Sequence, residues 1–290
     1  MDKNEKIDLH MHTTMSDGTD TPEEILERVK EAGITIFSVT DHDAINGCAR
    51  IREIIGKNDP LFITGVEFSC RDPEGRYHIL GYGYYPDAAS INDIVKKGHD
   101  LRMRKVQARL DFLRDEFGFG FSDDEIRELL ARNNPGKPHV AALMIKRGYA
   151  KDKDQAFELI NRKKIEDAYI RPEEAIRSIA DAGAIPVLAH PAFGSGDEII
   201  LGEELDARVR KLMDFGLAGL EAYYSGFSKK IRNDVLAIAE KYGLCVTAGS
   251  DYHGSNKLVR LGDTGLDDPD ADSAKVRDFL GKILSLRVGQ

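Results

Sequence analysis

The sequence has few features of an exported, membrane-bound or disulfide-stabilised protein. Its 290 residues include only three cysteines, Cys48, Cys70 and Cys245, without a CxxC spacing. This small, odd number argues against a disulfide framework and fits a reducing cytoplasm. The chain lacks any run of about 18 apolar residues, so we expect no membrane-spanning segment. The first residues, MDKNEKIDLHMH, have no apolar signal region, and a cytoplasmic protein is therefore expected.

The chain also has fewer basic than acidic residues. The chain has 41 Lys and Arg against 50 Asp and Glu, which gives a net charge of −9. Proteins that grip long nucleic acids usually have a basic surface, so the charge argues against such a partner. A small anionic substrate remains compatible with this charge, because bound metal ions can supply local positive charge. Nothing in the sequence indicates an oligomeric state.

Short apolar runs alternate with amphipathic helices over much of the chain. The first helix has a capping box formed by Thr21 and Glu24, with Pro22 at its first position and Gly33 at its end. Strand-helix alternation indicates a parallel sheet closed into a barrel. The expected strands are Ile7 to His12, Ile34 to Thr40, Leu61 to Val66, Tyr77 to Tyr84, Ile185 to Ala189, Leu217 to Ala222 and Leu244 to Ala248.

The pattern changes between about Ala88 and Arg171, where strand signals vanish. We interpret residues 88–171 as a helical insertion, and residues 1–87 with 172–290 as the barrel. The insertion is expected to contain helices over Ile91 to Phe117, Asp123 to Arg132, His139 to Arg147 and Asp154 to Asn161.

Residues of the types that bind metals recur at or near the ends of the expected strands. The carboxyl ends of parallel barrel strands meet on one face, so these side chains are expected to converge. They are His10 and His12 of the first strand, His42 after the second, Glu67 after the third, His78 in the fourth, His190 after the fifth, and Asp251 and His253 after the last.

Single members of this set are weak indicators. His10 and His12 lie two residues apart and point to the same side of a strand, but an exposed polar strand face explains that pair equally well. Asp17 alone is better explained as a turn residue, because Asp-Gly pairs favour turns. Asp43 is equally compatible with a metal ligand and a helix N-cap. Glu67, on an apolar strand end, needs a partner if buried, and a metal ion provides one.

The ordered set of motifs resembles the signature of the PHP (polymerase and histidinol phosphatase) family. The resemblance implies a distorted (β/α)7 barrel with a helical insertion domain that closes over the metal face. It is stronger to the stand-alone nucleotide and sugar-phosphate phosphoesterases than to histidinol phosphatases or polymerase-attached domains. The motifs are His10-x-His12, Asp17-Gly18, Thr40-Asp41-His42-Asp43, Gly65-x-Glu67-x-Ser69, His78, Ala189-His190-Pro191 and Ser250-Asp251-x-His253.

The same resemblance implies two to three divalent ions, of Mn, Fe or Zn. It assigns one ion to His10, His12, Glu67 and Asp251. It assigns a second ion, bridged by Glu67, to His78 and His190, and a third to Asp17, His42 and His253.

The expected activity is hydrolysis of a phosphate ester in a small metabolite, such as a nucleotide bisphosphate, cyclic phosphate or sugar phosphate. Divalent ions neutralise phosphate oxygens and lower the pKa of bound water, so a metal-bridging hydroxide is the expected nucleophile. His190, His253 or a metal-bound water are candidates for the acid that protonates the leaving oxygen. The resemblance implies a catalytic role for Glu67 through the ions that it would bridge.

Other activities compete with this interpretation. They include a 5′-3′ exonuclease on short oligonucleotides and a histidinol-phosphate phosphatase. An amidohydrolase usually has a metal-binding lysine, and no lysine lies at an expected strand end. A non-enzymatic metal-binding module would not need nine converging ligands.

The insertion carries the candidate substrate-binding residues. Lys96 to Arg109 holds six Lys or Arg and a single Asp, and Arg102, Lys105 and Arg109 share one helix face. A solvated basic face is the alternative. The segment from Pro135 to His139 reads as a rigid turn before a helix whose N-terminus suits a phosphate. We therefore expect Arg102, Lys137 and His139 to bind a second phosphate or another non-reacting part of the substrate.

Overall fold

Seven strands form a nearly closed, distorted barrel, as the sequence predicted. The computed structural model describes residues 5–165, 168–194 and 198–288. Neighbouring strands pair in chain order, and backbone hydrogen bonds such as Leu9 N–H to the Ala248 carbonyl (2.9 Å) join the first strand region to the last. The strands are β1 (Ile7–Asp8), β2 (Ile36–Val39), β3 (Leu61–Asp72), β4 (Gly75–Tyr82), β5 (Ile185–Leu188), β6 (Gly219–Tyr224) and β7 (Cys245–Gly249).

The expectation of a wholly parallel sheet is wrong at one strand. β4 runs antiparallel to both β3 and β5, because Pro73 and Glu74 form a tight turn that reverses the chain. β3 continues past its expected end, so Glu67 lies inside β3 rather than after it. His78 sits opposite Ser69 in this hairpin. The side chains of Glu67 and His78 therefore both reach the site from within strands.

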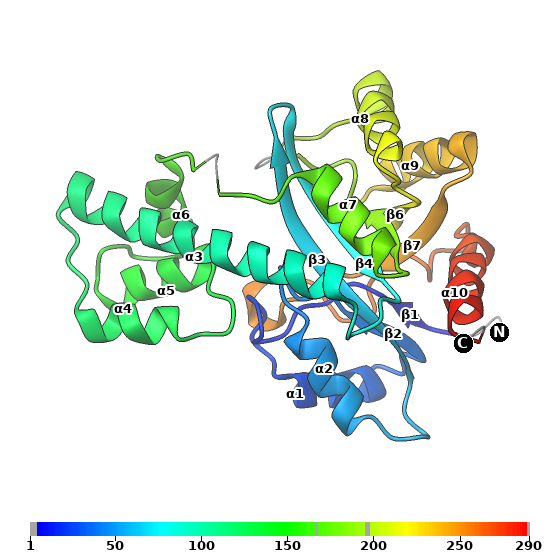
Figure 1. Ribbon diagram of the computed structural model, residues 1–290, viewed down its shortest axis with the longest axis horizontal. Coiled ribbons are helices and arrows are strands. Elements are labelled where there is room, and N and C mark those ends of the chain that lie inside the picture. The colour runs from blue at the N-terminus through cyan, green and yellow to red at the C-terminus, as the bar shows by residue number, and fades with distance from the viewer. Residues whose placement is uncertain (1–4, 166–167, 195–197, 289–290) are drawn as a thin grey trace.

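Helices cover the outside of the barrel (Figure 1). The capping box of Thr21 and Glu24 is confirmed, and Gly33 ends that helix with a φ of +66°. α9 packs against β6 and α10 against β7, which buries an aliphatic core around the strands. The barrel helices are α1 (Pro22–Glu31), α2 (Asn46–Ile54), α7 (Pro172–Asp181), α8 (Gly202–Asp214), α9 (Lys229–Tyr242) and α10 (Ser273–Val288), with a short 3-10 turn η1 (Gly254–Asn256).

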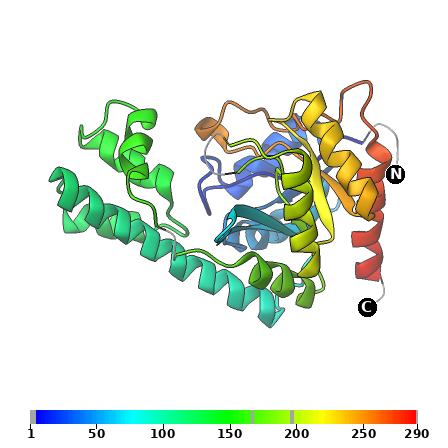
Figure 2. The same cartoon turned by 90° about the horizontal axis from the view of Figure 1, so that it is seen from above.

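Four helices lie between β4 and α7 and project from one side of the barrel (Figures 1 and 2). α3 (Ala89–Phe117) starts beside the barrel and runs outward, and α4 (Asp123–Leu130), α5 (Lys137–Lys146) and α6 (Lys153–Asn161) pack along its outer half. These helices share an apolar cluster that includes Val106, Leu113 and Met144 and is separate from the barrel core. Lys137 and Pro138 form the first turn of α5 rather than a turn before it. No helix in the described residues has the length and apolar character needed to cross a bilayer.

Candidate metal centre and adjoining cavities

The nine residues singled out as metal ligands all meet at one end of the barrel. They come from six different parts of the sheet and its loops, which is why convergence depends on the closed barrel. His10, His12 and Asp17 follow β1, His42 follows β2, Glu67 lies in β3, His78 in β4, His190 follows β5, and Asp251 and His253 follow β7.

Glu67 is at the centre of the group. Its Oε2 lies 3.3 Å from His10 Nε2 and 3.2 Å from His12 Nε2. Its Oε1 lies 3.0 Å from His78 Nδ1 and 3.4 Å from His190 Nε2. With His42 Nδ1 also 3.1 Å from Oε2, one oxygen faces three imidazoles and the other faces two different ones, as a carboxylate that bridges two ions would. Asp251 Oδ1 completes the first pair, 3.4 Å from His10 Nε2 and 3.3 Å from His12 Nε2.

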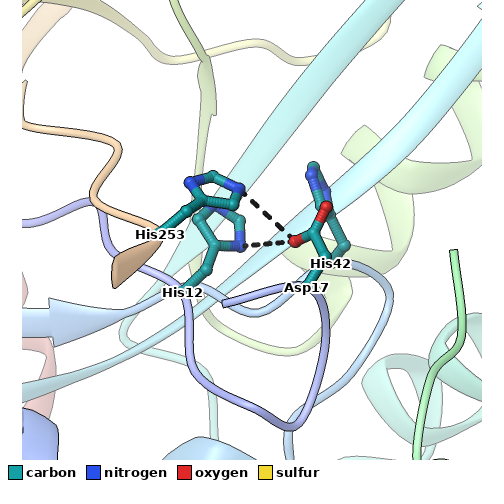
Figure 3. Close-up of side chains that lie close together, drawn as sticks. All are labelled: His12, Asp17, His42 and His253. Atoms are coloured by element: carbon teal, nitrogen blue, oxygen red, sulfur yellow. Dashed lines mark ion pairs between the residues drawn. The ribbon is translucent and has the colours of Figure 1, made fainter. Parts of the chain in front are cut away.

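A second group lies around Asp17. One ligand atom from each of His12, Asp17, His42 and His253 lies within 4.8 Å of the others. Figure 3 shows these side chains converging, with Asp17 Oδ1 3.3 Å from His253 Nε2 and 3.8 Å from His12 Nδ1. His42 also reaches Glu67, with Nδ1 3.1 Å from Oε2. The two groups are therefore contiguous.

Burial and mutual charge fix the protonation of these groups. Burial acts to raise the pKa of Glu67, but His42, His10 and His78 outweigh it and hold that pKa well below its ordinary value. The pKa of Asp17 is likewise held well below its ordinary value by His42 and His253 against the effect of burial. Burial also lowers the pKa of His42 and His253. Burial acts in the same direction on His10 and His12, but the surrounding carboxylates outweigh it and raise the pKa of both rings, chiefly Glu221 for His10 and Asp251 with Glu67 for His12. A bound divalent ion would have to displace the protons of these two rings. Ionised carboxylates and neutral imidazoles are the forms that bind divalent ions.

Three buried ligand atoms fit a metal because they make no hydrogen bond and face other candidate ligands. Glu67 Oε1, Asp17 Oδ1 and His78 Nδ1 are inaccessible to solvent and make no hydrogen bond. A buried polar atom without a partner is costly, and a cation placed among these atoms removes that cost. The mixture of nitrogen and oxygen donors without thiolate suits Mn, Zn or Fe.

The loops that carry the ligands have unusual backbone geometry. Among the described residues other than glycine, positive φ angles occur only at Asp43 (50°), His190 (29°) and Asp251 (57°). Two of these residues belong to the candidate centre and the third adjoins His42. Left-handed backbone is unfavourable for such residues and is typically retained where a site requires it.

Glu221 is a site residue that the sequence analysis missed. It is fully buried in β6, where Oε1 accepts a hydrogen bond from His10 Nδ1 (2.9 Å) and Oε2 accepts one from the His190 backbone N–H (2.8 Å). Carboxylates that orient metal-bound histidines in this way are common around metal sites. The sequence feature that could have identified Glu221 is its position as a lone carboxylate within the apolar strand Gly219–Tyr224.

Asp43 neither caps α2 nor joins the ligand cluster. Its Oδ2 accepts hydrogen bonds from Arg102 Nε (3.1 Å) and Nη2 (2.7 Å), and its Oδ1 accepts one from the Ser69 N–H (3.0 Å). α3 approaches closely here at Gly98, where a Cβ atom would lie 2.9 Å from Asp43 Cβ. A buried guanidinium of the inserted helices is thus paired with the loop that carries His42.

Asn134 makes a second contact to the same loop. It is 1% exposed, and its amide donates a short hydrogen bond to the His42 carbonyl while its Oδ1 contacts His99 Nδ1 at 3.3 Å. We call the contacts of Arg102 and Asn134 with Asp43 and His42 the loop clamp.

A cavity of about 560 Å³ opens between the ligand cluster and the inserted helices. Asp17, His42, His78 and His253 form its floor, and Asp17 is the sole carboxylate among its described lining residues. In a chain of net charge −9, this is a concentration of positive charge. Seven Lys or Arg line it: Arg76, Arg102, Lys105, Arg109, Lys137, Lys153 and Lys257. We call it the basic cavity.

Five of the seven cations have no anionic partner among the described residues; the two that have one are Arg102 and Lys257. Lys105 is 6% exposed and lies 3.8 Å from the centre of the Tyr169 ring. Burial, with help from the neighbouring Arg102, lowers the pKa of Lys105 to about 7. Arg76 Nε is buried without a hydrogen bond, and Arg109 lies alongside. A buried lysine and two half-buried arginines without an anionic partner are suited to binding an anion.

The expected substrate-binding residues are only partly brought together. Arg102 lines the basic cavity but is engaged with Asp43. Lys137 also lines it, with Nζ 3.2 Å from Asn161 Oδ1. His139 lies instead in a neighbouring cavity, and its Nδ1 accepts a hydrogen bond from the Gly136 N–H at the start of α5.

Sequence comparisons give consistent matches across most of the chain. The PHP domain family matches residues 8–214. A phosphoribosyl 1,2-cyclic phosphate 1,2-diphosphodiesterase from Eggerthella lenta is 30% identical over 258 residues, covering 85% of this chain and 94% of the relative. A 3′,5′-nucleoside bisphosphate phosphatase from Chromobacterium violaceum is 27% identical, covering 85% and 87%. A 5′-3′ exoribonuclease from Haemophilus influenzae is 30% identical, covering 89% and 93%.

Solved structures give the same fold. A Bifidobacterium adolescentis protein classed as a metal-dependent phosphoesterase superposes with a TM-score of 0.79 at 26% identity, covering 97% of this chain and 98% of that one. A Chromobacterium violaceum protein named as an amidohydrolase superposes with a TM-score of 0.80, covering 97% and 96%. At 23% identity, the second likeness shows the fold alone.

Proposed function

This chain belongs to the PHP domain family of metal-dependent phosphoesterases, and on that premise we propose that it hydrolyses a phosphate ester in a small metabolite that carries a second anionic group. The observation that carries the proposal is the basic cavity, which opens directly onto the ligand cluster. A phosphate held at the cluster would leave the rest of an anionic substrate facing unpaired cations. A substrate with a free amine, such as histidinol phosphate, would meet charge repulsion there.

We assign the ions as the PHP family pattern implies, and the side chains of each set lie close together. His10, His12, Glu67 and Asp251 would hold one ion. Glu67, His78 and His190 would hold a second, and Asp17, His42 and His253 a third. Two to three ions, with Mn tested first and Fe or Zn as alternatives, suit this donor set.

The chain's own residues position and protonate the reacting groups. Bound divalent ions supply charge neutralisation and activation of water. Glu221 fixes the His10 ring and the His190 backbone, so the imidazoles are already oriented when substrate arrives. His253 Nδ1 donates to the Asp251 carbonyl (2.9 Å), which aims Nε2 at the cluster. His190 and His253 are the candidates to protonate the leaving oxygen, each in a state in which its Nε2 does not hold an ion.

We propose that residues 88–171 act as a substrate cap on a barrel formed by residues 1–87 and 172–290. Their separate apolar cluster and their contribution of Arg102, Lys105, Arg109, Lys137 and Lys153 to the basic cavity support this division. The three cysteines are free, which agrees with an enzyme that works in the reducing cytoplasm.

Phosphate release measures the proposed function directly. With Mn²⁺ present, we expect adenosine 3′,5′-bisphosphate to be cleaved with at least about tenfold higher kcat/KM than adenosine 5′-monophosphate, because a second charge-assisted contact adds roughly 1.5–3 kcal/mol. A ribose cyclic phosphate and a 5′-phosphorylated trinucleotide complete the panel. Preference for the trinucleotide would identify an exonuclease. Absence of phosphate release from every substrate, with metal bound, would reject the proposal.

Lys105→Met tests the basic cavity. This change keeps the length of the side chain but removes its charge, so KM for the bisphosphate should rise about 10- to 100-fold. KM for the monophosphate should change less than about threefold, and kcat should change little in either case. Steady-state kinetics on the two substrates measure the difference.

The control is Lys96→Met on the same helix, because Lys96 is exposed and pairs with Asp100 (2.7 Å).

A pH series provides a second test of the role of Lys105. Since the pKa of Lys105 is about 7, its charge is lost as pH rises, and KM for the bisphosphate should increase above that value. Lys105→Arg should flatten this rise. Equal effects of Lys105→Met on both substrates would place the second anion elsewhere.

A further inference from the structure

A second cavity, of about 440 Å³, lies on the other side of the ligand cluster and has a different character. Its lining shares His42, His78 and Lys257 with the basic cavity, so the two cavities meet at the cluster. Away from the ligands, the described wall is apolar and aromatic, formed by Phe193, Ile199 and Tyr224. We call it the apolar cavity.

The aromatic wall is built from rings that hold one another. Phe193 and Tyr224 pack edge to face with their centres 5.7 Å apart, and Phe227 packs against both, at 5.2 Å from Phe193 and 5.1 Å from Tyr224. The Tyr224 hydroxyl donates to Asp251 Oδ2 (2.9 Å), and its ring centre lies 5.4 Å from that of His190. The wall therefore has a fixed position relative to two of the proposed metal ligands.

Ile199 extends the wall toward solvent. It bridges to Phe193 across a short antiparallel pair, with the Ile200 N–H donating to the Ala192 carbonyl (2.8 Å) and the Gly194 N–H donating to the Glu198 carbonyl (2.9 Å). This pairing holds a 57% exposed isoleucine at the mouth of the cavity. An exposed apolar side chain beside a catalytic cluster is unfavourable in water and becomes favourable once a ligand covers it.

We propose that the apolar cavity binds a planar, nucleobase-like ring of the substrate, while the second anion extends from the same ribose into the basic cavity. This inference rests on the proposed function and narrows its substrate class to nucleotides. The volume is in the range of small-ligand pockets, and aromatic faces bind a base by stacking with little dependence on its identity. A bare sugar phosphate has no group that would cover Phe193 and Ile199.

The test compares two substrates that differ only in the base, adenosine 3′,5′-bisphosphate and ribose 3,5-bisphosphate. Stacking on an aromatic ring strengthens binding by about 5- to 150-fold, so the wild-type enzyme should favour the adenosine compound by at least about tenfold in kcat/KM. Phe193→Ala and Ile199→Ser should each remove most of that preference and leave the ribose compound within about twofold of wild type. Phe193→Tyr should retain the preference, and Leu286→Ala, an exposed apolar residue on α10, is the control.

Equilibrium binding of adenosine 5′-monophosphate to the metal-loaded protein provides a readout that does not need turnover. Its Kd should rise at least about fivefold in Phe193→Ala, while inorganic phosphate binding stays unchanged. If the wild-type protein hydrolyses neither bisphosphate, the proposed function fails, and this binding measurement still decides on the cavity. Equal losses on both substrates, or unchanged nucleotide binding in Phe193→Ala and Ile199→Ser, would overturn the inference and leave the wall as a barrier to water.

Discussion

Glu67→Gln is expected to reduce phosphate release about a thousandfold or more. The substitution keeps the size of the side chain but removes the charge of a carboxylate whose two oxygens face separate sets of imidazoles. Two proposed ion sites lose a shared anionic ligand at once, and a loss of several kcal/mol of transition-state stabilisation corresponds to this factor. Glu67→Ala should behave in the same way. Phosphate release and metal content, measured on the same preparations, test the expectation.

The barrel itself should survive this change, because its apolar core does not depend on Glu67. Circular dichroism should therefore match wild type. Glu240→Gln is the matched control, since Glu240 is an exposed carboxylate that pairs with Lys275 on the outer helices. A Glu67→Gln protein that keeps most of its turnover with normal metal content would show that Glu67 does not bridge ions.

Removal of metal should abolish activity completely and reversibly. We expect protein purified without chelator to hold two to three ions per chain, because nine candidate ligands form contiguous groups too large for one ion. Dialysis against a chelator should stop phosphate release, and Mn²⁺ should restore it. Elemental analysis and phosphate release measure the two effects together.

The Asp17→Asn variant tests whether one of the proposed ions can be removed separately from the others. Asp17 belongs to the group with His42 and His253 but lies apart from Glu67 Oε1, His78 and His190. The variant should lose about one ion and retain the others. Less than one ion per wild-type chain, with no gain after adding metal, would contradict the assignment of a multi-ion centre.

The sequence indicated the barrel and the side chains that converge at its end, but it did not indicate the direction of every strand. Ligand positions were accessible because the histidines and carboxylates fall at strand ends or in HxH and DxH spacings that do not depend on strand direction. The antiparallel direction of β4 could not be predicted in this way, because strand periodicity does not reveal the direction of the partner strand. The decisive signal was the short Asp72-Pro73-Glu74-Gly75 turn.

Residues that act by positioning other residues could not be identified from the sequence. Glu221 orients a histidine 211 positions away, and no local motif marks it. Arg102 was expected to bind substrate because it lies on a basic helix face. The structure pairs it with Asp43, 59 positions away. Lys105 and Arg109 share that face and line the same cavity, but only the fold shows that they lack anionic partners among the described residues.

The loop clamp restricts how far the inserted helices can be exchanged between relatives. A graft that omitted Arg102 would leave Asp43, 2% exposed, as a buried charge without its partner, which is destabilising by about 3–5 kcal/mol. A graft that omitted Asn134 would leave the His42 carbonyl without its donor. A functional chimera therefore has to carry these residues together with a matching His42 loop. Across homologous chains, the same pairing predicts that the two segments change in concert.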